Sequence, residues 1–170
     1  MKKCLLCNEK IKENHLLCLD HYNEIKEKYP FIENLELEEL KLFMNLYIKA
    51  NPKDKLPDFQ CEDGHYVRST HEQLIDNFLY NNNIRHAYEQ KIEDKNKKEG
   101  YILCDWYLPD GNVYIEYWGM ENNTMYEEQK NYKLKIYKNF NLIQLYPEDT
   151  KKDLRFKLKQ ELAKYNIEIK

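Results

Sequence analysis

Residues 101–119 decide the expected fold, and they read YILCDWYLPDGNVYIEYWG. Apolar and aromatic side chains fill both ends of this stretch, which predicts strands over residues 101–108 and 113–118. Between them, Pro109-Asp110-Gly111-Asn112 predicts a tight turn, because proline fixes one φ angle and glycine accepts a positive one. The two strands should therefore pair antiparallel as a hairpin.

Each predicted strand carries one acidic residue among apolar neighbours, Asp105 on the first and Glu116 on the second. The two residues are nearly symmetric about the turn, so they should lie close together across the hairpin. Burying a carboxylate costs several kcal/mol unless it is paired or binds a cation. A divalent cation with oxygen ligands removes the repulsion between the two, which favours Mg²⁺ or Mn²⁺. The alternative for Asp105 is an ion pair with Arg68 or Arg85.

The surrounding elements place this hairpin in a mixed sheet that is flanked by helices. Apolar spacing predicts helices over residues 69–81, 124–139 and 149–165, and further strands over residues 86–92 and 142–146. From residue 69 onward the order is helix, three strands, helix, strand, helix. We therefore expect an α/β domain over residues 58–170, in which a crossover helix leads into the last strand.

The N-terminal segment predicts a small zinc module over residues 1–30. Cys4 and Cys7 are three residues apart, as are Cys18 and His21, and two such pairs can close a tetrahedron around Zn²⁺. A segment of about 30 residues has too little core to fold unaided, so a structural metal would supply the missing stability. His15 is a weaker spare ligand. The alternative is that the cysteines are ordinary buried residues.

A connecting helix and a linker follow the zinc module over residues 31–57. Apolar residues recur at helical spacing between residues 35 and 50. Two prolines, Pro52 and Pro57, then stop the helix from continuing, so we place the domain boundary in this linker.

Several motifs from residue 64 to the C-terminus carry a resemblance. They are residues 64–72 (GHYVRSTHE) leading into a helix, Tyr88-Glu89, residues 115–119 (IEYWG), and the helix over residues 126–137. In this order of elements, they resemble the PD-(D/E)xK nuclease superfamily, which has the restriction-endonuclease-like αβββαβ core. The resemblance implies that Asp105 and Glu116 bind a catalytic Mg²⁺ or Mn²⁺. It further implies that Glu72 is an additional acid, and that the backbone carbonyl of Tyr117 is a further metal ligand.

One residue departs from the superfamily pattern, which usually has lysine two residues after the second acid. Trp118 stands at that position here. Some members of the superfamily carry the lysine on the following helix, and Lys133 is the best match to that variant. Lys130 lies about one helical turn earlier and is the second choice.

The resemblance implies a Mg²⁺-dependent endonuclease that hydrolyses phosphodiester bonds, with DNA as the expected substrate and RNA left open. The alternative is a catalytically inactive, zinc-containing module that binds nucleic acid or protein on a decayed nuclease fold. Glu72 also has a structural interpretation, because Ser69-x-x-Glu72 is a capping box. A homodimer or a larger nuclease assembly is compatible with the superfamily.

Charge and composition agree with these expectations. The 170 residues carry a net charge of −3, and no apolar run is long enough to span a bilayer. A signal-peptide pattern is absent, so a cytoplasmic protein without membrane contact is expected. The net charge is −6 over residues 61–122 and +4 over residues 123–170. The acidic middle contains the proposed cation ligands, and the basic end could contact phosphates.

Overall fold

The computed structural model describes residues 2–119 and 123–169 and divides the chain into two compact units. The N-terminal unit comprises Met1–Leu56 with Asn123–Tyr126, and the C-terminal unit comprises Pro57–Asn122 with Glu127–Lys170. No helix in the described part of the chain is long and apolar enough to cross a membrane.

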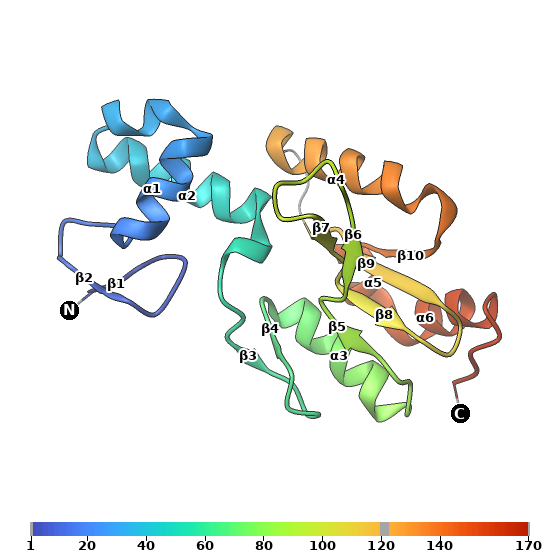
Figure 1. The fold of residues 1–170 in the computed structure, drawn as a ribbon. Coiled ribbons are helices and arrows are strands. Elements are labelled where there is room, and N and C mark those ends of the chain that lie inside the picture. Colours follow the sequence, from blue (N-terminus) through green and yellow to red (C-terminus); the bar gives the residue numbers. More distant parts are fainter. Residues whose placement is uncertain (1, 120–122, 170) are drawn as a thin grey trace. The chain divides into compact units, whose positions relative to one another are not determined.

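The N-terminal unit consists of a short hairpin followed by helices (Figure 1). Its elements are β1 (Lys2–Lys3), β2 (Lys10–Ile11), α1 (Leu19–Lys28), η1 (Pro30–Asn34), α2 (Leu37–Ala50) and η2 (Pro52–Asp54). One apolar cluster joins the hairpin to both α-helices, and it includes Cys4, Cys18, Ile25, Met44 and Tyr47. The segments 1–30 and 31–50 therefore share a single core.

The C-terminal unit is built on a four-stranded mixed sheet in the order β10-β9-β8-β5. These strands are β5 (Ala87–Tyr88), β8 (Trp106–Leu108), β9 (Val113–Tyr117) and β10 (Asn141–Leu145). β9 pairs antiparallel with β8 and parallel with β10, and β8 pairs antiparallel with β5. The unit is thus an α/β domain with a mixed sheet, as the sequence predicts. Two small hairpins are added to it, β3 (Phe59–Gln60) with β4 (Tyr66–Val67), and β6 (Lys91–Glu93) with β7 (Tyr101–Leu103).

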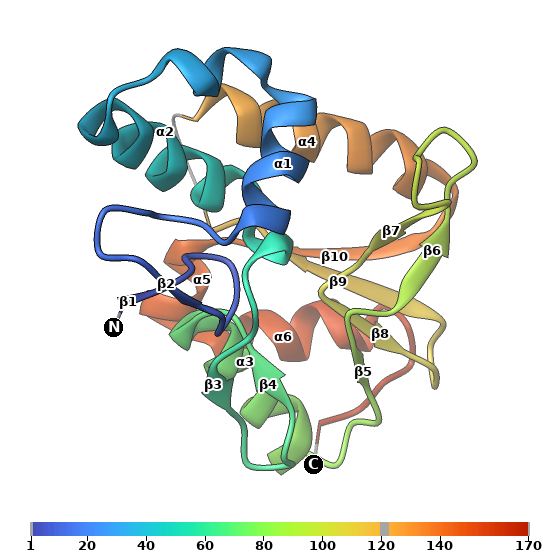
Figure 2. The same cartoon turned by 60° about the vertical axis from the view of Figure 1, so that its left-hand side comes forward.

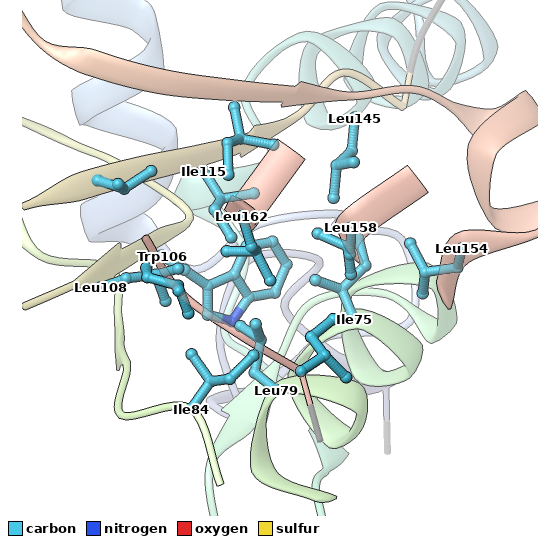
Figure 3. Close-up of a cluster of buried hydrophobic side chains, with 14 residues drawn as sticks. Ile75, Leu79, Ile84, Trp106, Leu108, Ile115, Leu145, Leu154, Leu158 and Leu162 are labelled. Atoms are coloured by element: carbon cyan, nitrogen blue, oxygen red, sulfur yellow. The ribbon is translucent and has the colours of Figure 1, made fainter. Parts of the chain in front are cut away.

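Helices cover both faces of this sheet (Figure 2). α3 (Thr70–Asn81) and α6 (Leu154–Ala163) lie on one face, and residues 127–136 of α4 (Thr124–Ile136) lie on the other, with η3 (Tyr137–Asn139) after them. Successive strand residues point to opposite faces. Trp106 and Ile115 therefore pack against α3 and α6 (Figure 3), whereas Tyr107 and Tyr114 pack on the side of Tyr137.

Two predicted strands are each divided in the structure. The predicted strand over residues 101–108 becomes β7 and β8, because β7 pairs with β6 in a separate hairpin while β8 joins the main sheet. The predicted strand over residues 86–92 becomes β5 and β6, and Glu89, at a φ of 56°, interrupts it. The first break comprises Cys104 and Asp105, and the second comprises Glu89 and Gln90.

Two further predictions are wrong in detail. The helix expected over residues 149–165 is divided into α5 (Pro147–Lys152) and α6, and Asp153 between them caps α6 by accepting a hydrogen bond from the Phe156 amide at 3.0 Å. In the turn between β8 and β9, the positive φ belongs to Asn112, at 47°, and not to Gly111.

Candidate functional site

Asp105 and Glu116 are buried at the same level of the sheet. Trp106 pairs with Ile115 in the β8–β9 register, so Asp105, just before β8, stands opposite Glu116. Asp105 is 5% exposed and Glu116 is 1% exposed. Buried carboxylates of this kind require hydrogen bonds or opposite charges.

Glu116 receives its opposite charge from α4. The ammonium of Lys133 lies 2.8 Å from one carboxylate oxygen of Glu116 and 2.9 Å from the other. The hydroxyl of Tyr137, on η3, donates a hydrogen bond of 2.5 Å to the same carboxylate. Burial, followed by the charge of Glu116, raises the pKa of Tyr137 well above its ordinary value, so this hydroxyl keeps its proton and remains a donor.

Asp105 is held by the backbone of the neighbouring strand. The Tyr117 amide donates a hydrogen bond of 2.6 Å to the Asp105 carboxylate. The charge of Asp105 is also among the causes that raise the pKa of Tyr137. The charges of both carboxylates thus act on the Tyr137 hydroxyl, so Asp105 and Glu116 share one electrostatic environment.

Glu72 lies in the first turn of α3. Ser69 caps this helix by accepting a hydrogen bond of 3.1 Å from the Glu72 amide. The Glu72 carboxylate accepts hydrogen bonds from the Arg68 amide at 2.9 Å and from the Tyr88 hydroxyl at 2.7 Å. In a capping box, the Glu72 carboxylate would accept a hydrogen bond from the Ser69 amide. Here the donor is the Arg68 amide instead. Glu72 is 7% exposed, so this carboxylate also belongs to the buried acids of the unit.

The aromatic residues near the site include Trp118, two residues after Glu116. Trp118 is 4% exposed, and its indole N–H donates a hydrogen bond of 3.0 Å to Gln144, the residue opposite Glu116 on β10. Both lysines considered for the site lie over this indole ring. The ammonium of Lys130 is 5.4 Å from the ring centroid, and that of Lys133 is 5.8 Å away. Lys133 additionally contacts Glu116.

An open cavity of about 520 Å³ borders these residues. It is lined by His71, Tyr117, Gly119, Pro147, Glu148 and Lys151. The rings of His71 and Tyr117 stack with centroids 5.5 Å apart. Tyr117 connects this cavity to the acids, because its backbone amide binds Asp105.

The predicted zinc ligands come together in the N-terminal unit. The ligand atoms of Cys4, Cys7, Cys18 and His21 all lie within 4.8 Å of one another. Burial alone would raise the pKa of Cys4, but backbone hydrogen bonds, led by that from Cys18, outweigh burial and lower this pKa to about 7. A lowered pKa favours the thiolate, the form that binds a metal, whereas burial raises the pKa of Cys18 to about 12, so the case for a metal rests on the convergence of the four ligand atoms. This group can therefore hold a metal ion such as zinc.

The carboxylates predicted to bind Mg²⁺ are arranged differently. Within residues 2–119 and 123–169, two groups of three or more potential ligands converge in this way, and Glu72, Asp105 and Glu116 do not form one of them. Asp105 and Glu116 fit a cation by their burial and opposed positions. The Glu72 carboxylate is directed to the Tyr88 hydroxyl and the Arg68 amide. It therefore fits contact with a cation through a water molecule better than direct coordination.

Comparison with known proteins gives no relative. No family model, curated protein or solved structure matches the chain. The interpretation of the site therefore rests on its residues.

The sequence analysis missed two features of the C-terminal unit. The first is Tyr137, four residues after Lys133 and thus on the same side of a helix, which is the signal that could have identified it. The second is the other converging group, formed by Asp63, His65, Asp76 and His86. These four residues span separate elements and form no short motif.

Proposed function

We propose that this protein is a Mg²⁺- or Mn²⁺-dependent endonuclease that hydrolyses phosphodiester bonds, with DNA as its substrate. The observation that carries this proposal is the contact between Lys133 and Glu116, since Glu116 stands opposite Asp105 in the sheet. An ammonium from a neighbouring helix, together with two opposed buried carboxylates, supplies the charges that phosphodiester hydrolysis requires.

Asp105 and Glu116 would hold the cation, and Glu72 would act on it through water. The bound cation would lower the pKa of a water molecule and neutralise charge that develops on the phosphate. Tyr137 keeps the Glu116 carboxylate in one orientation through its hydrogen bond of 2.5 Å. Lys133 has three donor hydrogens, so it can keep one bond to Glu116 and present another to a phosphate oxygen or to the attacking water.

Substrate binding is supported by the cavity and by the basic residues around it. Lys151 lines the cavity, and Lys130 lies near Trp118 and Tyr146, with its ammonium 4.9 Å from the centroid of the Tyr146 ring. Lysines that contact phosphates give an affinity that is independent of sequence and falls with salt. The charge of +4 over residues 123–170 supports this binding mode.

One observation favours the second candidate function, a catalytically inactive module that binds nucleic acid or protein. Lys133 and Tyr137 together satisfy the buried Glu116 carboxylate without any cation. The arrangement is therefore stable as a structural ion pair, and it would persist in a nuclease fold that had lost its activity.

A cleavage assay separates the two functions. The full chain is incubated with Mg²⁺ and supercoiled plasmid, and in parallel with single-stranded DNA and RNA. We expect Mg²⁺-dependent cleavage that falls at least 100-fold in Asp105→Asn, Glu116→Gln and Lys133→Gln, because each change removes a charge from the reacting centre. Circular dichroism confirms that each variant is folded.

Two lysine variants sharpen the assay. Lys135→Gln is the matched control, since Lys135 is an exposed residue of the same helix, and it should retain full activity. Lys130→Gln tests the second lysine and should weaken binding without abolishing cleavage. Equal cleavage by wild type, Asp105→Asn and Glu116→Gln would contradict the proposed function.

A further inference from the structure

A second group of potential metal ligands lies in the C-terminal unit, apart from the acids described above. Asp63 and His65 belong to the turn between β3 and β4, Asp76 lies on α3, and His86 directly precedes β5. Their ligand atoms all lie within 4.8 Å of one another. Three separate parts of the fold thus direct polar atoms toward one point.

Four of the distances between these ligand atoms are close to those around a tetrahedral metal. Zinc bonds of about 2.0–2.1 Å to nitrogen and oxygen place neighbouring ligand atoms about 3.3 Å apart. The Nδ1 atom of His65 is 2.9 Å from Asp63 Oδ2 and 3.5 Å from Asp76 Oδ2. The Nε2 atom of His86 is 3.2 Å from Asp63 Oδ2 and 3.5 Å from Asp76 Oδ2.

These close approaches lack the geometry of hydrogen bonds, and they are ion pairs only when the imidazoles are protonated. His65 Nδ1, His86 Nε2 and Asp76 Oδ1 are buried atoms that have no hydrogen-bond partner among the described residues. The Asp76 side chain is fully buried, and that of His86 is 5% exposed. Buried polar atoms are almost always paired, so three unpaired atoms in one cluster need an explanation. A shared metal ion would explain these atoms. The lone pair of each ring nitrogen would then point at the metal, and the carboxylate oxygens would lie to the side of that direction.

Outer hydrogen bonds orient the ligands. The Nδ1 atom of His86 is 2.8 Å from the Ile84 carbonyl oxygen, which can only accept, so Nδ1 donates and Nε2 is the nitrogen that faces Asp63 and Asp76. The Trp106 indole N–H donates to Asp76 Oδ2 at 2.9 Å. The His65 amide donates to Asp63 Oδ1 at 2.9 Å. Metal ligands are typically held by such contacts.

We propose that Asp63, His65, Asp76 and His86 form a second structural zinc site. Two imidazole nitrogens and two carboxylate oxygens suit Zn²⁺, whereas Mg²⁺ and Ca²⁺ prefer oxygen ligands alone. Four protein ligands leave no open position for a substrate, so the metal has a structural role. This inference does not depend on the proposed nuclease activity.

The site would brace the part of the unit that carries the candidate active site. Asp76 lies one helical turn after Glu72 on α3, and Trp106, which binds Asp76, follows Asp105. The metal would also fasten the short β3–β4 hairpin, whose two-residue strands have little core of their own. A single ion would thus connect a hairpin, a helix and the start of β5.

Metal content of the full chain tests the proposal. Protein prepared with Zn²⁺ and then freed of loosely bound metal should contain two zinc ions per chain, one for each converging group. His86→Gln and His65→Gln should each contain one. His71→Gln is the matched control, because it makes the same change on α3 outside the cluster, and it should retain two.

A Co²⁺ titration of the unmodified protein removes any dependence on the folding of variants. Tetrahedral Co²⁺ bound by cysteine shows strong thiolate charge-transfer absorption, which nitrogen and oxygen ligands do not produce. We expect one equivalent of Co²⁺ to develop this band and a second to add ligand-field absorption without it. Binding that saturates at one equivalent, or an unchanged zinc content in the His65 and His86 variants, would overturn the proposal.

Discussion

Glu116 is the most deeply buried carboxylate of the candidate active site. The free-energy cost of burying its charge depends on the groups that pair with it. Removing the Tyr137 hydroxyl should therefore be measurable. A hydrogen bond to a charged group contributes about 1.5–3 kcal/mol, so we expect Tyr137→Phe to lower the free energy of unfolding by about that amount. Urea denaturation followed by circular dichroism measures the change.

The matched control is Tyr114→Phe. The Tyr114 ring packs 5.8 Å from that of Tyr137, and the change removes the same hydroxyl from the same aromatic cluster without touching Glu116. Its loss of stability should be much smaller. Equal losses in the two variants would mean that the bond to Glu116 contributes nothing beyond packing.

Individual residues differ in how far the sequence can predict their roles. The resemblance to the nuclease superfamily implies that Lys133 lies near the acids, and its ammonium does contact Glu116. Its catalytic role stays a prediction. Tyr137 is harder to select among the chain's 15 tyrosines, because the spacing of four residues from Lys133 places it on the same side of the helix but does not show that its hydroxyl reaches Glu116.

At the scale of elements, the turn between β8 and β9 depends on Gly111 for space. A Cβ atom added there would lie 2.9 Å from Ile167 Cδ1 and 3.0 Å from Val113 Cγ2. We expect Gly111→Ala to cost about 1–3 kcal/mol of stability, the usual range for overpacking. Adding Ile167→Val, which removes Cδ1, should recover part of that cost in a double-mutant cycle measured by urea denaturation. Strict additivity of the two changes would contradict this explanation.

The sequence predicted the mixed sheet and the order of its main elements, but not where the strands and the last helix are broken. The turn Pro109-Asp110-Gly111-Asn112 was identified by its residue types, yet the positive φ lies at Asn112 and Gly111 is needed for packing. Asp153 interrupts an apolar pattern that continues at helical spacing through Leu154 and Leu158. Such breaks follow from pairing and capping contacts that local periodicity does not contain.

At the scale of the whole molecule, the two units differ in how their cores are built. The C-terminal unit buries a large cluster between its sheet and helices, whereas the core of the N-terminal unit includes two of the proposed zinc ligands, Cys4 and Cys18. The first metal group follows from the spacing of four residues near the N-terminus. The second brings together residues that are up to 23 positions apart, and only the folded chain unites them.

The difference between the cores predicts that loss of the first metal group unfolds one unit alone. Structural zinc contributes about 10–16 kcal/mol in small zinc-finger peptides, more than a unit of this size is expected to gain from its apolar core. Cys7→Ser should therefore abolish hydrogen-exchange protection in α1 and α2 and preserve it in β9 and β10, as measured by mass spectrometry. Cys7 is only partly buried, so the change removes a ligand with little effect on packing. Cys104→Ser, at a fully buried position of the other unit, should show the opposite pattern. Equal loss of protection across both units in Cys7→Ser would show that the chain unfolds as one cooperative body.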